Sequence, residues 1–333
     1  MNADEKTLLQ IMREDNARAG FPFAPRGVWI NLCHDFEEKF SAHGLPNDDI
    51  AYFNQSFSQS LPGNPRYHRY AVYMLYRFVK QRDTADLLGR FDWSTDTGYE
   101  IAIDGGRYSW DTLISLDTIL SIAEADSGIL DSSRIVADLG AGWGRIGYVL
   151  KRINPQVSYV VLDLPEILMI SMAVLPRMLP EESTSLYHQT RQASALSKQA
   201  LSEKGLWFAG SQDLLKIEDA AIDVFINIAS FQEMKLSQVR SYFDLIDCKV
   251  AGTFYTQQYV VVSEAQRPYN AISGLDKYPF KATWRERFKR HVTFSERFFE
   301  ACFDVNKPLN GPCPAFASSL STSTARLSTA ARS

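Results

Sequence analysis

A glycine-rich segment near the middle of the chain is the part of the sequence best suited to hold a ligand. It reads Asp138-Leu-Gly-Ala-Gly-Trp-Gly-Arg-Ile-Gly147 and follows an apolar run at 135–137. A strand that leads into Gly140 needs a residue without Cβ for a tight turn. Gly142 and Gly144 let the backbone approach a ligand closely, and a helix starting near Trp143 presents unpaired N–H groups to it. Glycine loops of this kind occur in several nucleotide-binding folds.

Two acidic residues indicate which kind of ligand this segment could bind. Asp138 stands two residues before the first glycine, and Asp163 ends the next apolar run, 159–162. Asp163 follows Gly140 by 23 residues (163 − 140), close to the ~20 expected for an acid that accepts hydrogen bonds from ribose hydroxyls. An aspartate at a strand end is commonly a turn or cap residue, but its place after this loop favours the ribose role.

The elements that must position these residues follow from the hydrophobic pattern. Short apolar runs alternate with helical patterns from residue 134 onward. The pattern predicts strands at 134–137, 157–162, 206–209, 222–228 and 252–262, and helices at 146–153, 165–175 and 236–246. This alternation predicts an α/β fold, a Rossmann-like doubly wound and mostly parallel sheet. Residues 182–204 could be a helical insertion or a loop.

The residues before the sheet have a different character. They are aromatic and interrupted by prolines, with helices predicted at 67–88 and 110–125. Their aromatic content is too high for a solvated tail, so we expect residues 1–109 to form an N-terminal helical cap over the acceptor site. The Ser/Thr/Ala-rich residues 311–333 are predicted to be disordered.

Composition excludes several classes of protein. The chain has 333 residues, 45% of them hydrophobic, and a net charge of −4. It can therefore bury a sizeable core, but it lacks the basic surplus of a dedicated nucleic-acid binder. The first residues are charged, which disfavours a signal peptide. No stretch reaches ~18 consecutive apolar residues, which disfavours a membrane span. We therefore expect a cytoplasmic protein.

The motifs resemble a known family. Residues 138–144 resemble the first motif of class I S-adenosylmethionine-dependent methyltransferases, Asp163 matches their ribose-binding acid, and 222–228 matches their fourth strand. More narrowly, segments 110–117, 138–147, 161–166 and 229–234 resemble a bacterial family of sugar O-methyltransferases associated with surface-polysaccharide biosynthesis. The resemblance covers roughly residues 110–305, and 110–310 would be the methyltransferase domain.

This resemblance implies a cofactor and its contacts. The cofactor would be S-adenosyl-L-methionine, with Asp138 near its methionine amino group and Asp163 on its ribose hydroxyls. The glycine backbone would lie beneath the methionine and ribose. The segment 209–213 would flank the adenine, and there Ser211 and Gln212 precede the acid Asp213. Which of these side chains meets the adenine amine is left open.

A sugar hydroxyl is a weak nucleophile, so a general base should assist methyl transfer. Ligands of open α/β sheets bind at the carboxyl ends of the strands, and Glu233 follows the predicted strand 222–228 at that edge. Glu233 is the first candidate for the base, provided that burial raises its pKa. It could equally be a carboxylate that stabilises a helix N-terminus. His291 is the second candidate, with a plain surface residue as the alternative.

Acceptor binding is expected to combine aromatic faces with polar side chains. The candidates are Tyr108, Trp110, Tyr255 and Gln257, each of which could instead belong to the core. Residues 264–292 carry seven basic and three acidic side chains. This surplus favours an anionic acceptor such as a nucleotide-linked sugar, and a solvated helix face explains it equally well.

Two other functions fit parts of the pattern. One is an NAD(P)-dependent oxidoreductase on a similar fold, although the one Tyr-x-x-x-Lys sequence, Tyr76 to Lys80, precedes the glycine loop. The other is a non-catalytic subunit that binds the cofactor, which the intact pair Asp138 and Asp163 disfavours. No metal is expected, because the exit from the strand 222–228 lacks an acid. The oligomeric state is left open.

Overall fold

The computed structural model describes residues 1–26, 28–45, 65–94, 100–260, 272 and 274–305. Its helices are α1 (Ala3–Ala19), α2 (Val28–His43), α4 (Pro65–Arg82), α5 (Leu87–Arg90), α6 (Trp110–Ala125), α7 (Arg145–Ile153), α8 (Pro165–Met178), α9 (Tyr187–Gln192), α10 (Lys198–Ser202) and α11 (Leu236–Lys249). Four 3-10 turns are η1 (Ser127–Leu130), η2 (Ser211–Lys216), η3 (Phe231–Glu233) and η4 (Leu275–Lys277). Within these ranges, no helix combines the length and the apolar character that a membrane crossing needs.

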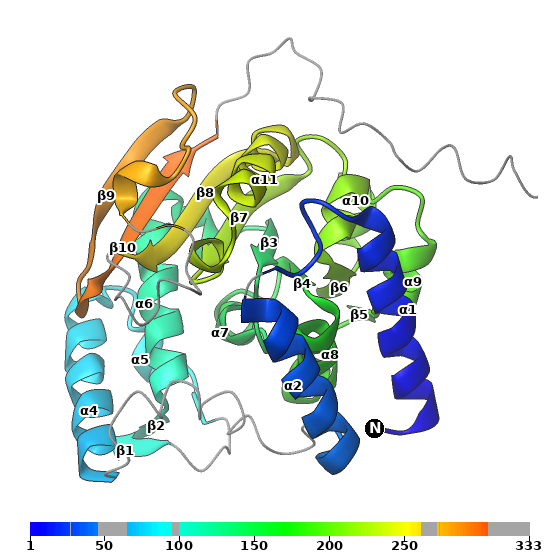
Figure 1. Cartoon of the computed structure of the whole chain (residues 1–333). Coiled ribbons are helices and arrows are strands. Elements are labelled where there is room, and N and C mark those ends of the chain that lie inside the picture. Colours follow the sequence, from blue (N-terminus) through cyan, green and yellow to red (C-terminus); the bar gives the residue numbers. More distant parts are fainter. Residues whose placement is uncertain (27, 46–64, 95–99, 261–271, 273, 306–333) are drawn as a thin grey trace, which may run out of the picture.

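The strands form one large sheet and a small hairpin. The hairpin joins β1 (Ile101–Ile103) to β2 (Gly106–Tyr108). The large sheet contains β3 (Ile135–Leu139), β4 (Ser158–Asp163), β5 (Thr184–Ser185), β6 (Leu206–Gly210), β7 (Ile222–Ile228), β8 (Val250–Tyr259), β9 (Arg285–Val292) and β10 (Ser295–Asp304). Its order is β5-β6-β4-β3-β7-β8-β10-β9 (Figure 1).

The direction of the strands confirms the predicted α/β fold with a mostly parallel sheet. Strands β3 to β8 pair in parallel, and β10 pairs antiparallel with both β8 and β9. Strands β4 and β6 lie on one side of β3, and the later strands β7 and β8 lie on its other side. The topological switch point therefore lies between β3 and β7.

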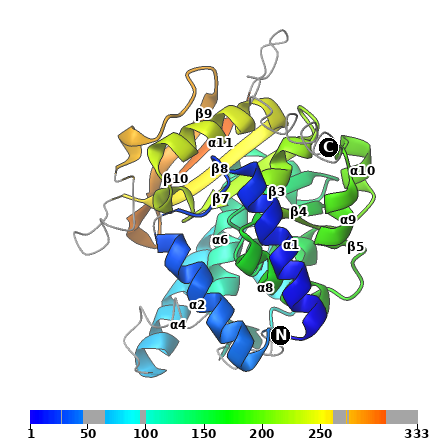
Figure 2. The ribbon, with the colours of Figure 1, turned by 45° about the vertical axis from the view of Figure 1, so that its right-hand side comes forward.

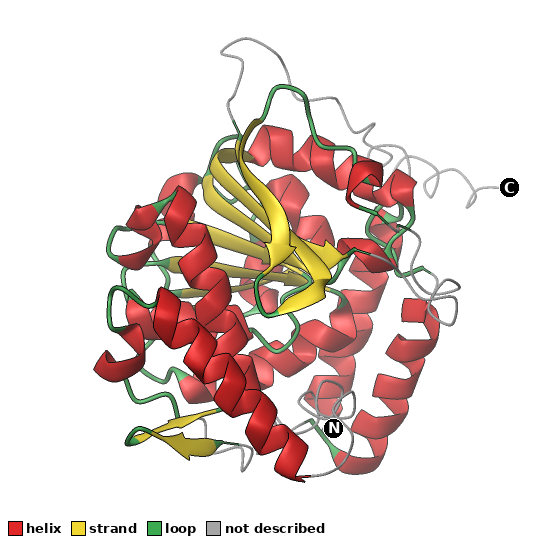
Figure 3. Cartoon of the chain, turned by 90° about the vertical axis from the view of Figure 1, so that its left-hand side faces the viewer, coloured by secondary structure: helices red, strands yellow, loops and turns green. Residues whose placement is uncertain are grey.

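Alternation along the strands divides the core into two layers, one on each face of the sheet. On β3, Val136 joins a cluster with α6, α7 and α8, whereas Ile135 and Ala137 join a cluster with α10 and α11. On β4, Val161 and Val160 divide between the same two clusters. Figure 3 shows the helices lying on both sides of the twisted sheet. A strand buried on both faces reads as a continuous apolar run, which explains why β3, β4, β6, β7 and β8 were predictable. Strands β5, β9 and β10 were not predicted.

The N-terminal residues form helices in two separate places. Helix α1 packs on α8 and η2, and α2 packs on α8. Figure 2 shows both helices in front of the sheet, on the side of α8. Helix α4 instead packs on α6 and on β1. The described residues before Trp110 therefore contain helices, as predicted, together with the short hairpin of β1 and β2, and α4 lies apart from α1 and α2.

Several predicted boundaries differ from the structure. The predicted helix 67–88 ends at Arg82 and is followed by the separate helix α5. The ambiguous stretch 182–204 contains β5, α9 and α10. The basic stretch contains the edge strand β9 rather than a helix face. The predicted disordered tail, 311–333, lies outside the described residues.

Candidate active site

The three glycines Gly140, Gly142 and Gly144 of the loop have two different roles. Gly140, Gly142 and Gly144 all have positive φ, at 74°, 63° and 91°. A Cβ on Gly140 would collide with Ser230, and one on Gly144 would collide with Leu175. A Cβ on Gly142 would meet nothing within 4 Å. Gly140 and Gly144 are thus required by packing, whereas Gly142 leaves open space above the loop.

That open space belongs to a cavity of about 260 Å³ at the carboxyl ends of β3 and β7, which we call the β3–β7 cavity. Its walls come from the sheet edge, from α8 and α11, and from the connection between α1 and α2. The lining residues are Pro22, Phe23, Ala24, Pro25, Arg26, Trp29, Leu139, Gly140, Gly142, Asp163, Leu164, Ile167, Ser211, Ile228, Ala229, Ser230, Glu233, Met234, Gln238 and Tyr242. The position is the topological switch point, where open α/β sheets bind their ligands.

Asp163 is the last residue of β4, and its side chain links this strand to the glycine loop. Its carboxylate accepts hydrogen bonds from the backbone N–H of Gly142, at 2.9 Å, and of Leu164, at 2.7 Å. Burial raises the pKa of Asp163 to about 7, although these two hydrogen bonds act in the opposite direction. Each carboxylate oxygen uses one lone pair for an amide and retains another for a ligand hydroxyl.

Glu233 is the second carboxylate in the cavity. It ends η3, directly after β7, and its side chain is partly exposed toward the cavity. The indole Nε1–H of Trp29 donates to its Oε2 at 2.7 Å. Burial raises the pKa of Glu233 to about 7, and the hydrogen bond from Trp29 lowers it. A carboxyl group with this pKa can exchange a proton near neutral pH.

The polar wall beside η2 differs from the arrangement that the family resemblance implies. Ser211 lines the β3–β7 cavity, but Gln212 and Asp213 do not. Gln212 accepts from Asn16 Nδ2 at 3.0 Å and donates to the hydroxyl of Tyr187 at 3.3 Å, so it connects α1 to α9.

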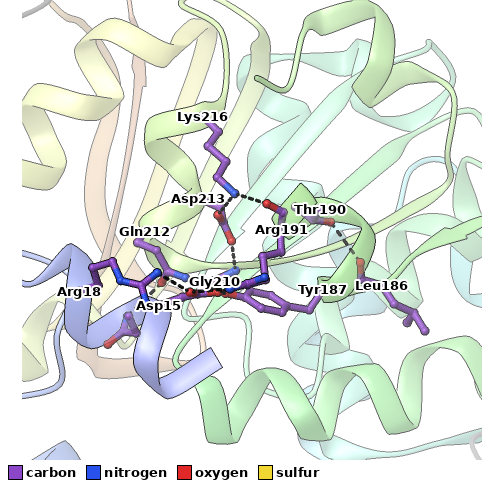
Figure 4. Close-up of polar contacts among 11 residues, drawn as sticks. Asp15, Arg18, Leu186, Tyr187, Thr190, Arg191, Gly210, Gln212, Asp213 and Lys216 are labelled. Carbon is purple, nitrogen blue, oxygen red and sulfur yellow. Dashed lines mark hydrogen bonds and ion pairs between the residues drawn. The ribbon is translucent and has the colours of Figure 1, made fainter. Parts of the chain in front are cut away.

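Asp213 has a structural role in the same wall. It accepts from the backbone N–H of Gly210 at 2.9 Å and pairs with Lys216, also at 2.9 Å (Figure 4). Of the three residues predicted beside the adenine, only Ser211 is at the cavity.

Asp138 lies beneath the cavity rather than on its wall. Its carboxylate is 2% exposed and accepts a hydrogen bond from the hydroxyl of Tyr159. Burial raises the pKa of Asp138 to about 6, and the bond from Tyr159 lowers it. Gly144 is also absent from the lining. A contact between Asp138 and a ligand amino group therefore stays a prediction.

The predicted acceptor residues lie elsewhere in the molecule. Tyr108, on β2, donates to the carbonyl of Leu88 at 3.0 Å, and Trp110 starts α6 and packs edge-on against Phe294. Tyr255 lies on β8, as does Gln257, and donates to Glu300 at 2.8 Å. None of the four predicted residues lines the β3–β7 cavity.

The second base candidate and the basic stretch are also away from the cavity. His291 is exposed on the edge strand β9, opposite Phe299. Several cations of this stretch form ion pairs: Arg285 and Arg287 with Asp304, Lys281 with Asp244, and Arg290 with Glu124 and Glu300. Neighbouring acids thus neutralise much of the charge that the sequence suggested for an anionic acceptor.

Sequence reasoning missed the connection between α1 and α2 as part of the site. Its residues 22–26 and Trp29 of α2 line the cavity, and Arg26 is the one basic residue among the lining residues. Gln238 of α11 holds this segment by donating to the carbonyl of Pro22 at 2.8 Å and of Ala24 at 3.4 Å. The Pro-x-x-Pro sequence at 22–25 indicates an interruption between two helices but does not indicate what this segment covers.

The Tyr-x-x-x-Lys pair is remote from the cavity. Lys80 Nζ donates to the hydroxyl of Tyr76 at 3.2 Å and to Asp104 at 2.6 Å. Both residues belong to α4, which packs on α6 and β1. The pair therefore has no contact with a ligand at the glycine loop, which weighs against the oxidoreductase alternative.

Comparisons with known proteins give only distant similarity. No family model matches the chain, and no curated protein matches it. A protein from Pyrococcus horikoshii superposes with a TM-score of 0.41 at 12% identity, over 59% of this chain and 92% of that one.

Two methyltransferase structures superpose less closely. A proposed O-methyltransferase from Nostoc punctiforme gives a TM-score of 0.38 at 10% identity, over 58% of this chain and 55% of that one. A SAM-dependent methyltransferase from Aquifex aeolicus gives 0.35 at 13% identity, over 56% and 93%. Similarity at this level carries no functional conclusion, and the fold rests on the strand order of the chain itself.

Proposed function

We propose that this protein transfers a methyl group from S-adenosyl-L-methionine to a hydroxyl oxygen of a sugar. The observation that carries the proposal is the arrangement at Gly142. Its missing side chain opens onto the β3–β7 cavity, and its N–H bonds to Asp163, the acid that ends the neighbouring strand. This pairing of a glycine loop with an acid on the next strand suits a ribose-containing cofactor.

The residues present fit the nucleoside half of that cofactor. Asp163 would accept the ribose hydroxyls with its remaining lone pairs, and Ser211 would meet the adenine edge. Leu139, Ile167 and Tyr242 supply apolar and aromatic walls. A Cβ at Gly142 would occupy the space above the loop, which explains why a glycine is needed there. Asp138 is expected near the methionine amino group on the family resemblance alone.

Glu233 is the proposed general base. Bound S-adenosylmethionine supplies a methyl group on an already activated sulfonium, so the chain has to align the acceptor and accept its proton. The carboxylate of Glu233 faces the cavity, and its pKa of about 7 leaves an ionised fraction that can take a proton near neutral pH. Without burial, a carboxylate would be too weak a base for a sugar hydroxyl.

The sugar acceptor rests on the family resemblance, which associates the motifs with surface-polysaccharide or nucleotide-sugar biosynthesis. The part of the cavity formed by residues 22–26 and Trp29 is the region left for an acceptor once the nucleoside lies beside β3 and β4. Arg26 supplies a cation there, which suits an acceptor with a phosphate or carboxylate group.

Cofactor binding tests the site with a matched pair of glycine variants. Gly142→Val is expected to weaken S-adenosylmethionine binding at least about 100-fold, measured by calorimetry, because the side chain fills the cavity. Gly105→Val is the control: Gly105 also has positive φ and open space around its Cβ, in the turn between β1 and β2. Equal binding by both variants would refute the assignment.

Turnover tests the reaction. With labelled S-adenosylmethionine and a series of sugar nucleotides, Glu233→Gln should lower methyl transfer at least about 100-fold and leave cofactor affinity nearly unchanged. His291→Ala should have near-normal turnover. A large loss in His291→Ala with a normal Glu233→Gln would transfer the role to His291. Cofactor binding without turnover on any sugar would favour a non-catalytic subunit, and binding of NAD(P) instead would favour an oxidoreductase.

A further inference from the structure

The hydrogen bond between Trp29 and Glu233 joins the N-terminal region to the proposed base. The two residues are 204 positions apart in the chain, and the indole Nε1 lies 2.7 Å from the carboxylate Oε2. Both side chains line the β3–β7 cavity. Helix α2 therefore contributes to the chemistry of the site as well as to its enclosure.

Neighbouring contacts hold the segment that leads to Trp29. The backbone before it is fixed by Gln238, whose amide donates to the carbonyl of Pro22. Phe23 packs edge-on against Tyr242 with ring centroids 5.8 Å apart, and Asn16 donates to the carbonyl of Phe23 at 3.3 Å. The indole thus enters the cavity from an anchored segment.

Trp29 is the single hydrogen-bond donor to the Glu233 side chain within the described part of the chain. A carboxylate on a short 3-10 turn can rotate about several bonds, so one directional donor determines which way its oxygens point. A donor to the ionised form also favours that form over the acid. Losing the indole N–H would therefore change both the orientation and the ionisation of Glu233.

We propose that Trp29 is a positioning residue for Glu233, which orients the carboxylate toward the reacting hydroxyl and favours its ionised form over the acid. This inference rests on the proposed function. It predicts that the N-terminal region takes part in proton transfer, rather than only covering the acceptor.

Other titratable groups interact electrostatically with Glu233 or line the same cavity. Asp163 ends β4, Tyr259 ends β8, Tyr242 comes from α11, and Arg26 lies beside Trp29 on the cavity wall. Burial holds the pKa of Asp163 at about 7 as well, and the charge of Glu233 contributes to that increase. A bulk titration would mix the two acids, so the test requires signals specific to each residue.

The first experiment follows the indole and the carboxyl group by NMR in the full chain without any ligand. The indole ¹H–¹⁵N signal of Trp29 should titrate with a midpoint near the pKa of Glu233, and Glu233→Gln should abolish that titration. Replacing Trp29 by the isosteric benzothienylalanine, which has no N–H, should raise the midpoint of the Glu233 carboxyl ¹³C signal by about one to two pH units. An indole signal that does not shift with pH, or that still titrates in Glu233→Gln, would overturn the proposal.

The second experiment measures the pH profile of turnover. The same replacement should shift the acid limb of kcat upward by about one to two pH units, so that part of the activity lost at pH 7 returns at pH 9. The loss of kcat that remains at pH 9 would report the lost orientation, and cofactor affinity should not change. An unshifted limb, or complete recovery of kcat at pH 9, would overturn the positioning role.

A matched control separates this effect from the general loss of an indole N–H. Trp284 donates to Asp247 at the same distance, 2.7 Å, and lies outside the cavity. Benzothienylalanine at position 284 should leave the pH profile unchanged, and an equal shift there would refute the proposal. If the NMR coupling holds but the wild-type protein methylates nothing, the proposed function fails, whereas an uncoupled titration in an active enzyme refutes only the role of Trp29.

Discussion

Replacing Glu233 with glutamine should stabilise the protein at alkaline pH while it lowers turnover. Burial raises the pKa of this group from its ordinary 4.5 to about 7, so the folded state holds a proton that the unfolded chain has already released. The difference of 2.5 between those values, at 1.36 kcal/mol per pKa unit, corresponds to at most about 3 kcal/mol.

The sign follows from linkage. Below pH 4.5 the carboxyl group is protonated in both states and contributes nothing to the pH dependence. Between pH 4.5 and 7 only the unfolded chain loses the proton, so wild-type stability falls as the pH rises. Above pH 7 the penalty is fully present. Glutamine does not titrate and its oxygen can still accept from Trp29, so the variant avoids this loss.

Urea unfolding at a series of pH values measures this difference. The free energy of unfolding of the variant relative to wild type should rise by at most about 3 kcal/mol between pH 4.5 and 8, with equal m-values. Comparing the two proteins cancels most contributions of groups that titrate alike in both. Parallel stability curves across this range would refute the account of a carboxylate destabilised by burial, and with it the basis for assigning Glu233 as the base.

Three further perturbations test the neighbouring contacts. Asp163→Asn should weaken cofactor binding at least about tenfold at pH 8, measured by calorimetry. Wild-type affinity should decline below about pH 7, where Asp163 takes up a proton, and the variant should lack this decline. Tyr159→Phe deprives the buried carboxylate of Asp138 of a donor and should cost about 1–3 kcal/mol at pH 8 in urea unfolding, but less at pH 5; equal losses would contradict this. Deleting residues 1–43 removes part of the cavity wall and should lower cofactor affinity at least about tenfold, so a fully active truncated enzyme would disprove the cap.

The local pattern of the sequence determined the central sheet and the glycine loop. Strands such as 222–228 are buried on both faces and read as continuous apolar runs. The helix predicted at 110–125 has the same bounds as α6. Asp163 was predictable because the spacing from strand to glycine to acid lies within one β-α-β unit. In each case the physical cause acts over a few tens of residues.

Other features depended on contacts between distant segments. Nothing near Trp29 in the sequence indicates that its indole contacts Glu233. The two side chains are brought together by the position of α2 beside η3 in the folded chain. The basic stretch around β9 resembled a binding surface until the acids of neighbouring elements, such as Asp304, were seen beside it.

The sequence also does not distinguish which of several similar polar residues contacts a ligand. Asp138 and Asp163 both follow strand runs, but the side chain of Asp138 points to Tyr159 beneath the loop and that of Asp163 to the cavity. Tyr255 and Gln257 are polar residues on a central strand, and their burial depends on the antiparallel strand β10, whose Glu300 lies 45 positions after Tyr255. Periodicity specifies which residues share a face of one element, whereas the packing of elements far apart in the chain decides which polar groups meet a ligand.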